Sequence, residues 1–243
     1  MDWNVFFIDP GGRYTSYLAW MMSAWGWTVA VALSALLVAL VFGVAIGTLR
    51  TLPGHPWLVR LGNAWVEVFR NVPLLVQIFI WYYVLPALVP PLKDLPSFVL
   101  VVAALGLFTS ARIAEQVRSG ILSLPTGQRQ AGLALGLSLP QCYRYVLLPM
   151  AARVILPPLT SETMNIFKNS SVAFAVSIPE LTMFAMQAQE ETSRGVEIYL
   201  AVTVLYIVSA LSINRLMTAI ERRVRVPGML GGQPSAATQG ASR

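Results

Sequence analysis

Several ionisable or strongly polar side chains stand inside segments that are otherwise apolar. The densest group is Glu162, Asn165 and Asn169, at the end of the apolar run that begins at residue 154. Spacings of three and four residues place these side chains on one face of a helix. Ionisable groups inside an apolar segment are costly to bury and mark paths for ions and polar solutes. This face is therefore a candidate binding site, and an internal ion pair of Glu162 with Lys168 is the alternative.

Arg112 is the second such residue, near the end of another apolar run. A cation inside a membrane span costs at least about 2.5 kcal/mol unless it is paired or hydrated. Glu115 is three residues further on and could form a salt bridge with it along the helix. Arg112 could instead face an open path and attract an anionic solute, because guanidinium binds carboxylate through two parallel hydrogen bonds. The sequence leaves both interpretations open.

A third group lies around the start of the apolar run at Val72. Glu67 and Arg70 are three residues apart and can form an ion pair that fixes the depth of a helix at an interface. Gln77 stands one turn into the apolar run, where its carboxamide needs a polar partner. That partner is either a solute or a neighbouring helix.

Residues 130–149 are too polar to cross a membrane, although apolar segments flank them. The pattern predicts a short helix that stops at Gly136 and a second that opens at Ser138, with Gln141 completing a capping box. Pro140 fits the first turn of the second helix, and Pro149 is expected to end it. The result is a bent loop with one apolar and one polar face.

Composition places the chain among integral membrane proteins of the all-α class. It has 243 residues, of which 56% are hydrophobic and 12% charged. One cysteine and one histidine leave no cluster for a metal, and we expect no cofactor. Neither lysine follows a glycine, so the chain has no phosphate-binding P-loop, and no catalytic triad or carboxylate dyad is evident. The net charge of +6 is spread over loops between apolar runs, which indicates membrane topology and not nucleic-acid binding.

Five apolar segments are candidates for crossing the membrane, since about 20 apolar residues suffice. They are residues 27–49, 72–89, 97–117, 154–167 and 198–217. The fourth is short, and Pro157 and Pro158 are expected to break its start. A GxxxG pattern at Gly43 and Gly47 in the first segment favours close helix packing.

The basic residues predict the orientation. Thirteen of the 17 fall on one side if the first connector, the polar loop and the C-terminus share that side. By the positive-inside rule this side is cytoplasmic and the N-terminus is periplasmic. The thirteen are Arg50, Arg60, Arg70, Arg112, Arg118, Arg129, Arg144, Arg153, Arg215, Arg222, Arg223, Arg225 and Arg243.

The polar loop resembles the EAA loop of permease subunits of ATP-binding-cassette importers. Glu67 to Gln77 resembles the E-x-F-R-x-x-P-L-L-V-Q signature of their polar amino acid branch, and residues 109–121 resemble a second signature, with Arg112 where a tyrosine is usual. Within the loop, the motif positions are occupied by Gln130, Ala131, Gly132, Gly136, Val146, Leu148 and Pro149, with Gln130 replacing the usual acid and Gly132 the second alanine. The strings are most similar to those of glutamate/aspartate permeases.

This resemblance implies an all-α fold with five transmembrane helices, the type I importer or MetI-like fold, in a bacterial inner membrane. It implies a second, homologous permease in a heterodimer, two copies of a cytoplasmic ATPase that docks on the loop, and a periplasmic solute-binding protein. The chain itself would be no enzyme. The solute would be contacted by Arg112, Gln77 and Asn169, with Glu162 taking its α-ammonium group and Asn165 its α-carboxylate.

The expected organisation has three parts: a periplasmic lead-in at 1–26, a transmembrane domain at 27–225 with its coupling loop at 119–150, and a disordered cytoplasmic tail at 226–243. Two other functions are considered. The same architecture could carry another polar amino acid, with Arg112 serving only structure. The chain could also be a membrane scaffold that recruits an ATPase without transport.

Overall fold

The computed structural model describes residues 1–224, and every regular element in that range is helical. The all-α prediction is therefore confirmed, while the predicted tail at 226–243 lies outside the described residues. Among the short helices, η2 and η4 are single π-helical turns. In chain order the elements are η1 (Trp3–Phe7), α1 (Tyr17–Leu49), α2 (Pro56–Asn71), α3 (Leu74–Phe79), η2 (Ile80–Val84), α4 (Leu85–Leu88), η3 (Pro90–Leu92), α5 (Ser97–Leu122), α6 (Thr126–Ala134), α7 (Leu139–Cys142), η4 (Tyr143–Leu147), α8 (Leu148–Asn169), η5 (Ser170–Val176), α9 (Leu181–Thr192) and α10 (Gly195–Val224).

Three helices, α1, α5 and α10, are each long and apolar enough to cross a membrane. Two bent pairs raise the number of candidate spans in residues 1–224 to as many as five if each pair is one span: α2 with residues 74–88, bent by 103°, and residues 139–176 with α9, bent by 53°. This agrees with the five predicted spans. The first helix is longer than its predicted span, because Ser16 accepts a hydrogen bond from the Ala19 N–H (3.1 Å) and starts α1 at Tyr17. The expected boundary at residue 26 falls inside it.

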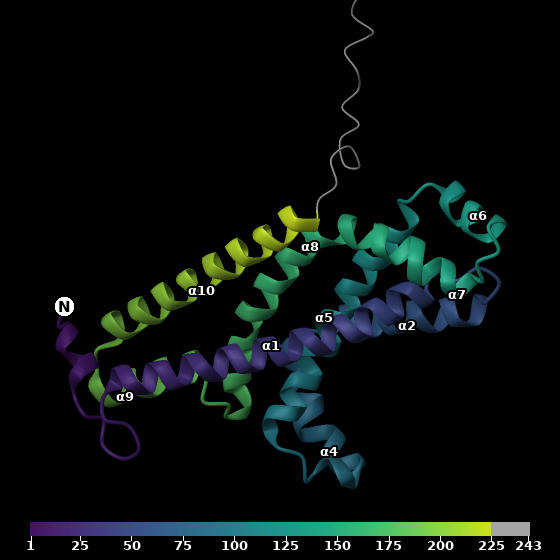
Figure 1. Cartoon of the computed structure of the whole chain (residues 1–243). Coiled ribbons are helices and arrows are strands. Elements are labelled where there is room, and N and C mark those ends of the chain that lie inside the picture. The colour runs from purple at the N-terminus through teal and green to yellow at the C-terminus, as the bar shows by residue number, and fades with distance from the viewer. Residues whose placement is uncertain (225–243) are drawn as a thin grey trace, which may run out of the picture.

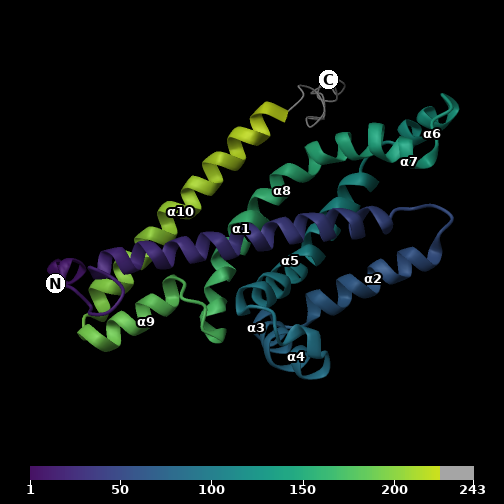
Figure 2. The same ribbon diagram turned by 60° about the horizontal axis from the view of Figure 1, so that its bottom comes forward.

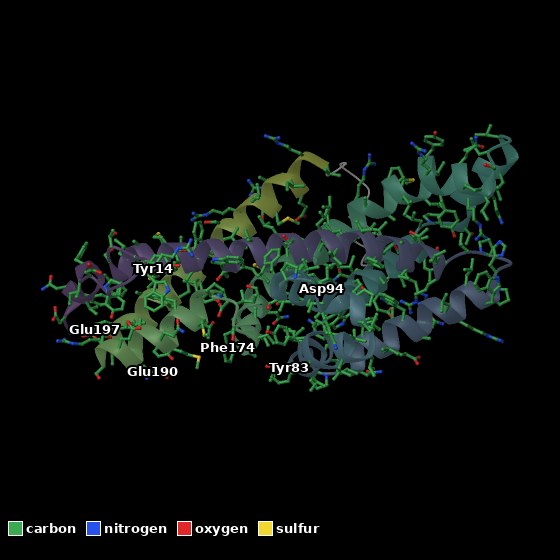
Figure 3. The ribbon with its side chains drawn as sticks, turned by 90° about the horizontal axis from the view of Figure 1, so that it is seen from below. Tyr14, Tyr83, Asp94, Phe174, Glu190 and Glu197 are labelled. Atoms are coloured by element: carbon green, nitrogen blue, oxygen red, sulfur yellow. The ribbon has the colours of Figure 1, made fainter. Side chains whose placement is uncertain are left out.

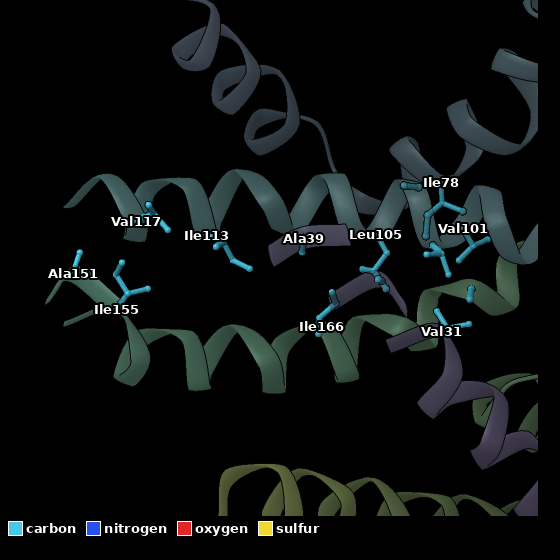
Figure 4. Close-up of a cluster of buried hydrophobic side chains, with 14 of the residues drawn as sticks. Val31, Ala39, Ile78, Val101, Leu105, Ile113, Val117, Ala151, Ile155 and Ile166 are labelled. Atoms are coloured by element: carbon cyan, nitrogen blue, oxygen red, sulfur yellow. The ribbon is translucent and has the colours of Figure 1, made fainter. Parts of the chain in front are cut away.

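Helices α1 and α5 pack along each other in the middle of the molecule (Figures 1 and 2). Gly43 of the predicted GxxxG pair allows this approach, since a Cβ there would lie 2.6 Å from the Cβ of Ile113. Gly47 meets Val117 in the same way. Figure 4 shows the buried apolar cluster that these helices form with α8, in which Ile155 and other α8 side chains point towards α5. The prediction of close packing at these glycines is confirmed.

Each π turn is followed directly by a Leu-Pro pair, Leu85-Pro86 in one case and Leu148-Pro149 in the other. The N–H of Leu148 donates to the carbonyl of Tyr143, five residues back. A proline inside an α-helix lacks one donor and its ring clashes with the carbonyl four residues earlier. The wider turn before it relieves that conflict. The helical path therefore continues through Pro149, and the prediction that this residue ends it is wrong.

The prolines of α8 also fail to break it. Pro157 and Pro158 lie inside the continuous helix, which packs against α5 and α10. The interruption comes later, after η5, where Ser177 is in the left-handed conformation (φ 60°) and the chain turns into α9. Packing along two helices thus outweighs the local preference of the prolines.

Different helices lie at the two ends of the molecule. The N-terminus, α9 and the start of α10 lie at one end, whereas α6 and α7 lie at the other (Figures 1 and 2). In Figure 3, Tyr14, Glu190 and Glu197 mark the first of these ends. The backbone N–H of Asp2 donates to Oε1 of Glu197 at 2.8 Å, which ties η1 to α10. The polar loop is therefore separated from the N-terminus by the full length of α1.

Candidate solute site and coupling loop

Arg112 of α5 and Glu162 of α8 face each other across the contact between their helices. Nη1 of Arg112 lies 3.9 Å from Oε2 of Glu162. The arginine side chain is 42% exposed and the glutamate 13%. Within residues 1–224, this buried Oε2 atom has no hydrogen-bond partner. The guanidinium also lies over the ring of Phe108, 5.1 Å from its centroid. This arrangement can accept a further polar group.

Glu115 has a different partner from the one its spacing suggested. Nη2 of Arg50, at the end of α1, lies 2.8 Å from Oε1 of Glu115, and Nε of Arg50 donates to Oδ1 of Asn63 at 2.8 Å. Of the two interpretations that the sequence left open for Arg112, the salt bridge with Glu115 is therefore not formed among residues 1–224. A long side chain from another helix reaches Glu115, which leaves Arg112 directed at Glu162.

The polar face of α8 is preserved in the structure. Asn165 lies beside the Glu162 carboxylate and within hydrogen-bonding reach of it. Asn169, one turn further, is the last residue of α8. Lys168 is exposed, and among the described residues Glu162 pairs with Arg112 in its place. Glu162, Asn165 and Arg112 thus come together, as a binding site for a charged solute requires.

Gln77 is buried at the joint between α2 and α3. Its Nε2 donates to the carbonyls of Phe69 (2.7 Å) and Val72 (3.0 Å), the last turn of α2. Terminal carbonyls of a helix need such donors. Of the two predicted partners, the side chain therefore takes a neighbouring helix and fixes the 103° bend. A contact of Gln77 with the solute therefore remains a prediction.

Glu67 and Arg70 form no ion pair with each other in the described part of the chain. Both instead line a polar cavity between α2 and α5, together with Arg50 and Glu115. Their predicted pairing is replaced by a shared cavity.

The polar loop has the predicted capping box and the predicted bend at Gly136. Oε1 of Gln141 accepts from the N–H of Ser138 at 2.8 Å and from its hydroxyl at 2.9 Å. Gly136 has φ +85°, a conformation that favours glycine, and the N–H of Leu137 closes the end of α6 on the carbonyl of Gly132 at 3.1 Å. The first helix is longer than predicted, since α6 starts at Thr126.

The residues of the EAA-like motif divide into an exposed and an inner set. Gln130, Ala131 and Gly136 are exposed, whereas Gly132 is buried against Cys142. A Cβ on Gly132 would lie 3.0 Å from the Cys142 sulfur, so glycine replaces the usual alanine where a thiol takes the space. Val146 and Leu148 are half-buried beneath the loop, and Pro149 is exposed.

Three residues that support these features escaped prediction. Arg50 pairs with Glu115 and also donates from Nε to Oδ1 of Asn63. The Tyr143 hydroxyl donates to the carbonyl of Thr51 at 2.8 Å, which ties the loop to the α1–α2 connection. Their partners are 13 to 92 positions away in the chain. No local pattern reports such contacts. Within residues 1–224, no group of three His, Cys, Asp or Glu side chains could hold a metal ion.

Comparisons with known proteins agree with this architecture. Residues 39–226 match the family described as the inner membrane component of binding-protein-dependent transport systems. The chain is 42% identical over 242 residues to the glutamate/aspartate import permease protein GltJ of Escherichia coli K12, covering 96% of this chain and 98% of GltJ. It is 35% identical over 188 residues to the glutamine transport system permease protein GlnP of the same organism, covering 77% and 84%.

Solved structures give the same result. A crystal structure of an amino acid ABC transporter with histidines has a TM-score of 0.74 and 29% identity, covering 85% of this chain and 95% of that one. The inward-facing MetNI methionine transporter has a TM-score of 0.73 at 22% identity, covering 86% and 98%, and shows the fold alone. Proteins of this kind work with ATPase and solute-binding partners. The chain therefore belongs to the family of inner-membrane components of binding-protein-dependent transport systems, as a multi-pass permease subunit that is not itself an enzyme.

Proposed function

We propose that this permease subunit imports acidic amino acids, glutamate or aspartate. The observation that carries the proposal is the half-exposed Arg112 guanidinium placed 3.9 Å from Glu162, whose Oε2 lacks a hydrogen-bond partner within residues 1–224. The similarity to the glutamate/aspartate permease GltJ over nearly the whole chain supports the same substrate class.

The two charges suit the two ends of such a solute. The Arg112 guanidinium can bind the side-chain carboxylate through two parallel hydrogen bonds. Glu162 would take the α-ammonium group at Oε2, and Asn165 would donate to the α-carboxylate. Asn169, on the same face of α8, would contact the solute as it moves along the helix. Gln77 would act from a distance, through the joint that it stabilises.

The loop at 119–150 would transmit force from an ATPase to the helices. We place it in the cytoplasm, with the N-terminus in the periplasm, on the strength of the basic residues gathered at the loop end. The partners would be a second, homologous permease in a heterodimer, two ATPase subunits and a periplasmic solute receptor. The ATPase would dock on exposed loop residues such as Gln130, Ala131 and Leu135, the last of which is 84% exposed.

Uptake by the full complex in proteoliposomes tests the substrate. Receptor loaded with glutamate or aspartate should stimulate ATP hydrolysis and give accumulation inside the vesicles. A complex that responds to no amino acid would refute the transport proposal.

Replacement of Gly136 by valine tests the coupling. A β-branched residue is disfavoured at φ +85°, at a cost of about 1–2 kcal/mol. The loop should lose its bend, so that uptake falls more than ATP hydrolysis. Gly127→Val is the matched control, because Gly127 lies in α6 without a positive φ and has no atom within 4 Å of a Cβ. Equal uptake by both variants would exclude the hinge role.

Glutamine is the second candidate substrate, favoured by the match to the glutamine permease GlnP. In that case Arg112 would only neutralise Glu162. A competition panel separates the two: glutamate and aspartate should compete best under the first proposal, and glutamine under the second.

A further inference from the structure

A polar cavity of about 440 Å³ lies between α2 and the ends of α1 and α5. Its volume exceeds by many times the roughly 30 Å³ that one water molecule occupies in the liquid. It is separate from the Arg112–Glu162 contact and has no part in the function proposed above. Its charged lining residues are Arg50, Glu67, Arg70, Glu115 and Arg118.

Two guanidinium groups at this cavity have N–H donors without partners. Arg50 is only 9% exposed, and its Nη1 makes no hydrogen bond in the described part of the chain, although its Nε and Nη2 are both engaged. Nε of Arg118 is likewise shielded from solvent and without a partner among residues 1–224. A buried donor that is left unsatisfied is unfavourable. Both groups therefore require an acceptor that residues 1–224 do not supply.

The charge of the lining defines that acceptor. Three arginines, Arg50, Arg70 and Arg118, face two glutamates, Glu67 and Glu115. Arg50 and Glu115 neutralise each other at 2.8 Å, which leaves two positive charges against one negative charge. One unit of positive charge remains, so a singly charged oxyanion would balance the cavity.

The outer side of α2 is suited to lipid. Trp57, Leu61 and Val68 are 63%, 60% and 60% exposed and, at spacings of four and seven residues, share one face of the helix. Asn63 and Arg70, which line the cavity, stand on the opposite face of α2 by the same helical spacing. A ligand with an anionic head and apolar chains could thus place its head in the cavity and its chains along α2.

We propose that this cavity binds the phosphodiester headgroup of an anionic phospholipid from the leaflet on the side of the coupling loop. Nη1 of Arg50 and Nε of Arg118 donate to phosphate oxygens, and the acyl chains lie against the face of Trp57, Leu61 and Val68. Basic pockets between transmembrane helices are suited to such headgroups.

The experiment uses the full transporter complex in dodecyl maltoside, supplied with phosphatidylglycerol, and counts retained lipids per complex by native mass spectrometry. Arg118→Gln should weaken retention about tenfold, the effect of losing a charge-assisted hydrogen bond. Glu67→Gln should strengthen retention, because it raises the positive charge of the cavity. Arg60→Gln is the matched control, since Arg60 is an exposed arginine of α2 outside the cavity lining, and it should retain lipid as the unmodified chain does.

If Arg118→Gln impairs folding, Glu67→Gln still tests the proposal, because it should increase lipid retention. Equal lipid retention in all four proteins would overturn the proposal. A parallel titration with inorganic phosphate distinguishes the source of the oxyanion. If inorganic phosphate binds with the same dependence on Arg118 and phosphatidylglycerol does not, the site serves a soluble anion and the lipid assignment is wrong.

Discussion

Helix α5 takes part in two arginine–glutamate pairs that differ in geometry and exposure. Arg50 and Glu115 are 2.8 Å apart, and the arginine side chain is 7% exposed with a second bond to Asn63. Arg112 and Glu162 are 3.9 Å apart, and that arginine is 42% exposed. The first pair is closed and joins α1 to α5. The second is open and leaves donors and acceptors available.

The comparison separates a structural ion pair from a candidate binding site on one helix. A buried charge is tolerated where its partner is close, and Arg50 has Glu115 at 2.8 Å and a second bond from Nε to Asn63, although its Nη1 has no partner among residues 1–224. A half-exposed charge at 3.9 Å contributes little to folding. Exposure and distance, more than residue type, therefore assign the roles of these four side chains. Four single substitutions, one double variant and one control test this assignment.

Glu115→Leu should have the largest effect. It leaves the 7% exposed Arg50 charge without its carboxylate, and breaking a buried pair in this way costs about 3–5 kcal/mol. We expect a large drop in the melting temperature of the purified complex. Arg50→Met should cost less, since Glu115 is 34% exposed and can be hydrated.

The double variant Arg50→Met/Glu115→Leu should recover much of the stability lost in Glu115→Leu alone, because no isolated charge remains. If the double variant is as unstable as the sum of the two single variants, the pair is not the interaction that joins α1 to α5.

Arg112→Gln should have the second-largest effect. This effect is on transport and not on stability. The loss of a charge-assisted hydrogen bond, worth about 1.5–3 kcal/mol, predicts a rise of about 10- to 100-fold in the apparent KM for glutamate and aspartate. The melting temperature should change little. If the apparent KM rises equally for glutamate and glutamine, Arg112 does not bind the side-chain carboxylate and serves only to neutralise Glu162.

Gly43→Ala should have the smallest effect and sharpen the comparison. The added Cβ would lie 2.6 Å from Ile113, so α1 and α5 must separate, at an overpacking cost of about 1–3 kcal/mol. The Arg50–Glu115 pair spans this contact, whereas Arg112 and Glu162 join α5 to α8. Stability should therefore fall while KM stays unchanged.

Gly26→Ala provides the control for this variant. Gly26 is in the same helix, and a Cβ there has no atom within 4 Å. A matching loss of stability in Gly26→Ala would attribute the effect to the helix itself and not to its packing against α5.

The sequence alone predicted the features that depend on neighbours in the chain. The capping box of Ser138 and Gln141 spans three residues, and the bend at Gly136 needs one residue that accepts a positive φ. The apolar segments predicted five spans for the same reason, since span length and composition are local properties. The polar face of Glu162 and Asn165 followed from helical periodicity.

Only the tertiary structure decided which partners these residues take. Spacing allowed a pair of Arg112 with Glu115 and predicted a pair of Glu67 with Arg70, but arginine side chains are long, and Arg50 reaches Glu115 from a residue 65 positions away. Pro149, Pro157 and Pro158 were expected to end or break helices, yet a π turn and contacts with α5 and α10 preserve the helical path. Sequence patterns describe only the preferences of neighbouring residues. The free energy of packing between helices exceeds the small free-energy differences between local conformations on which those patterns depend.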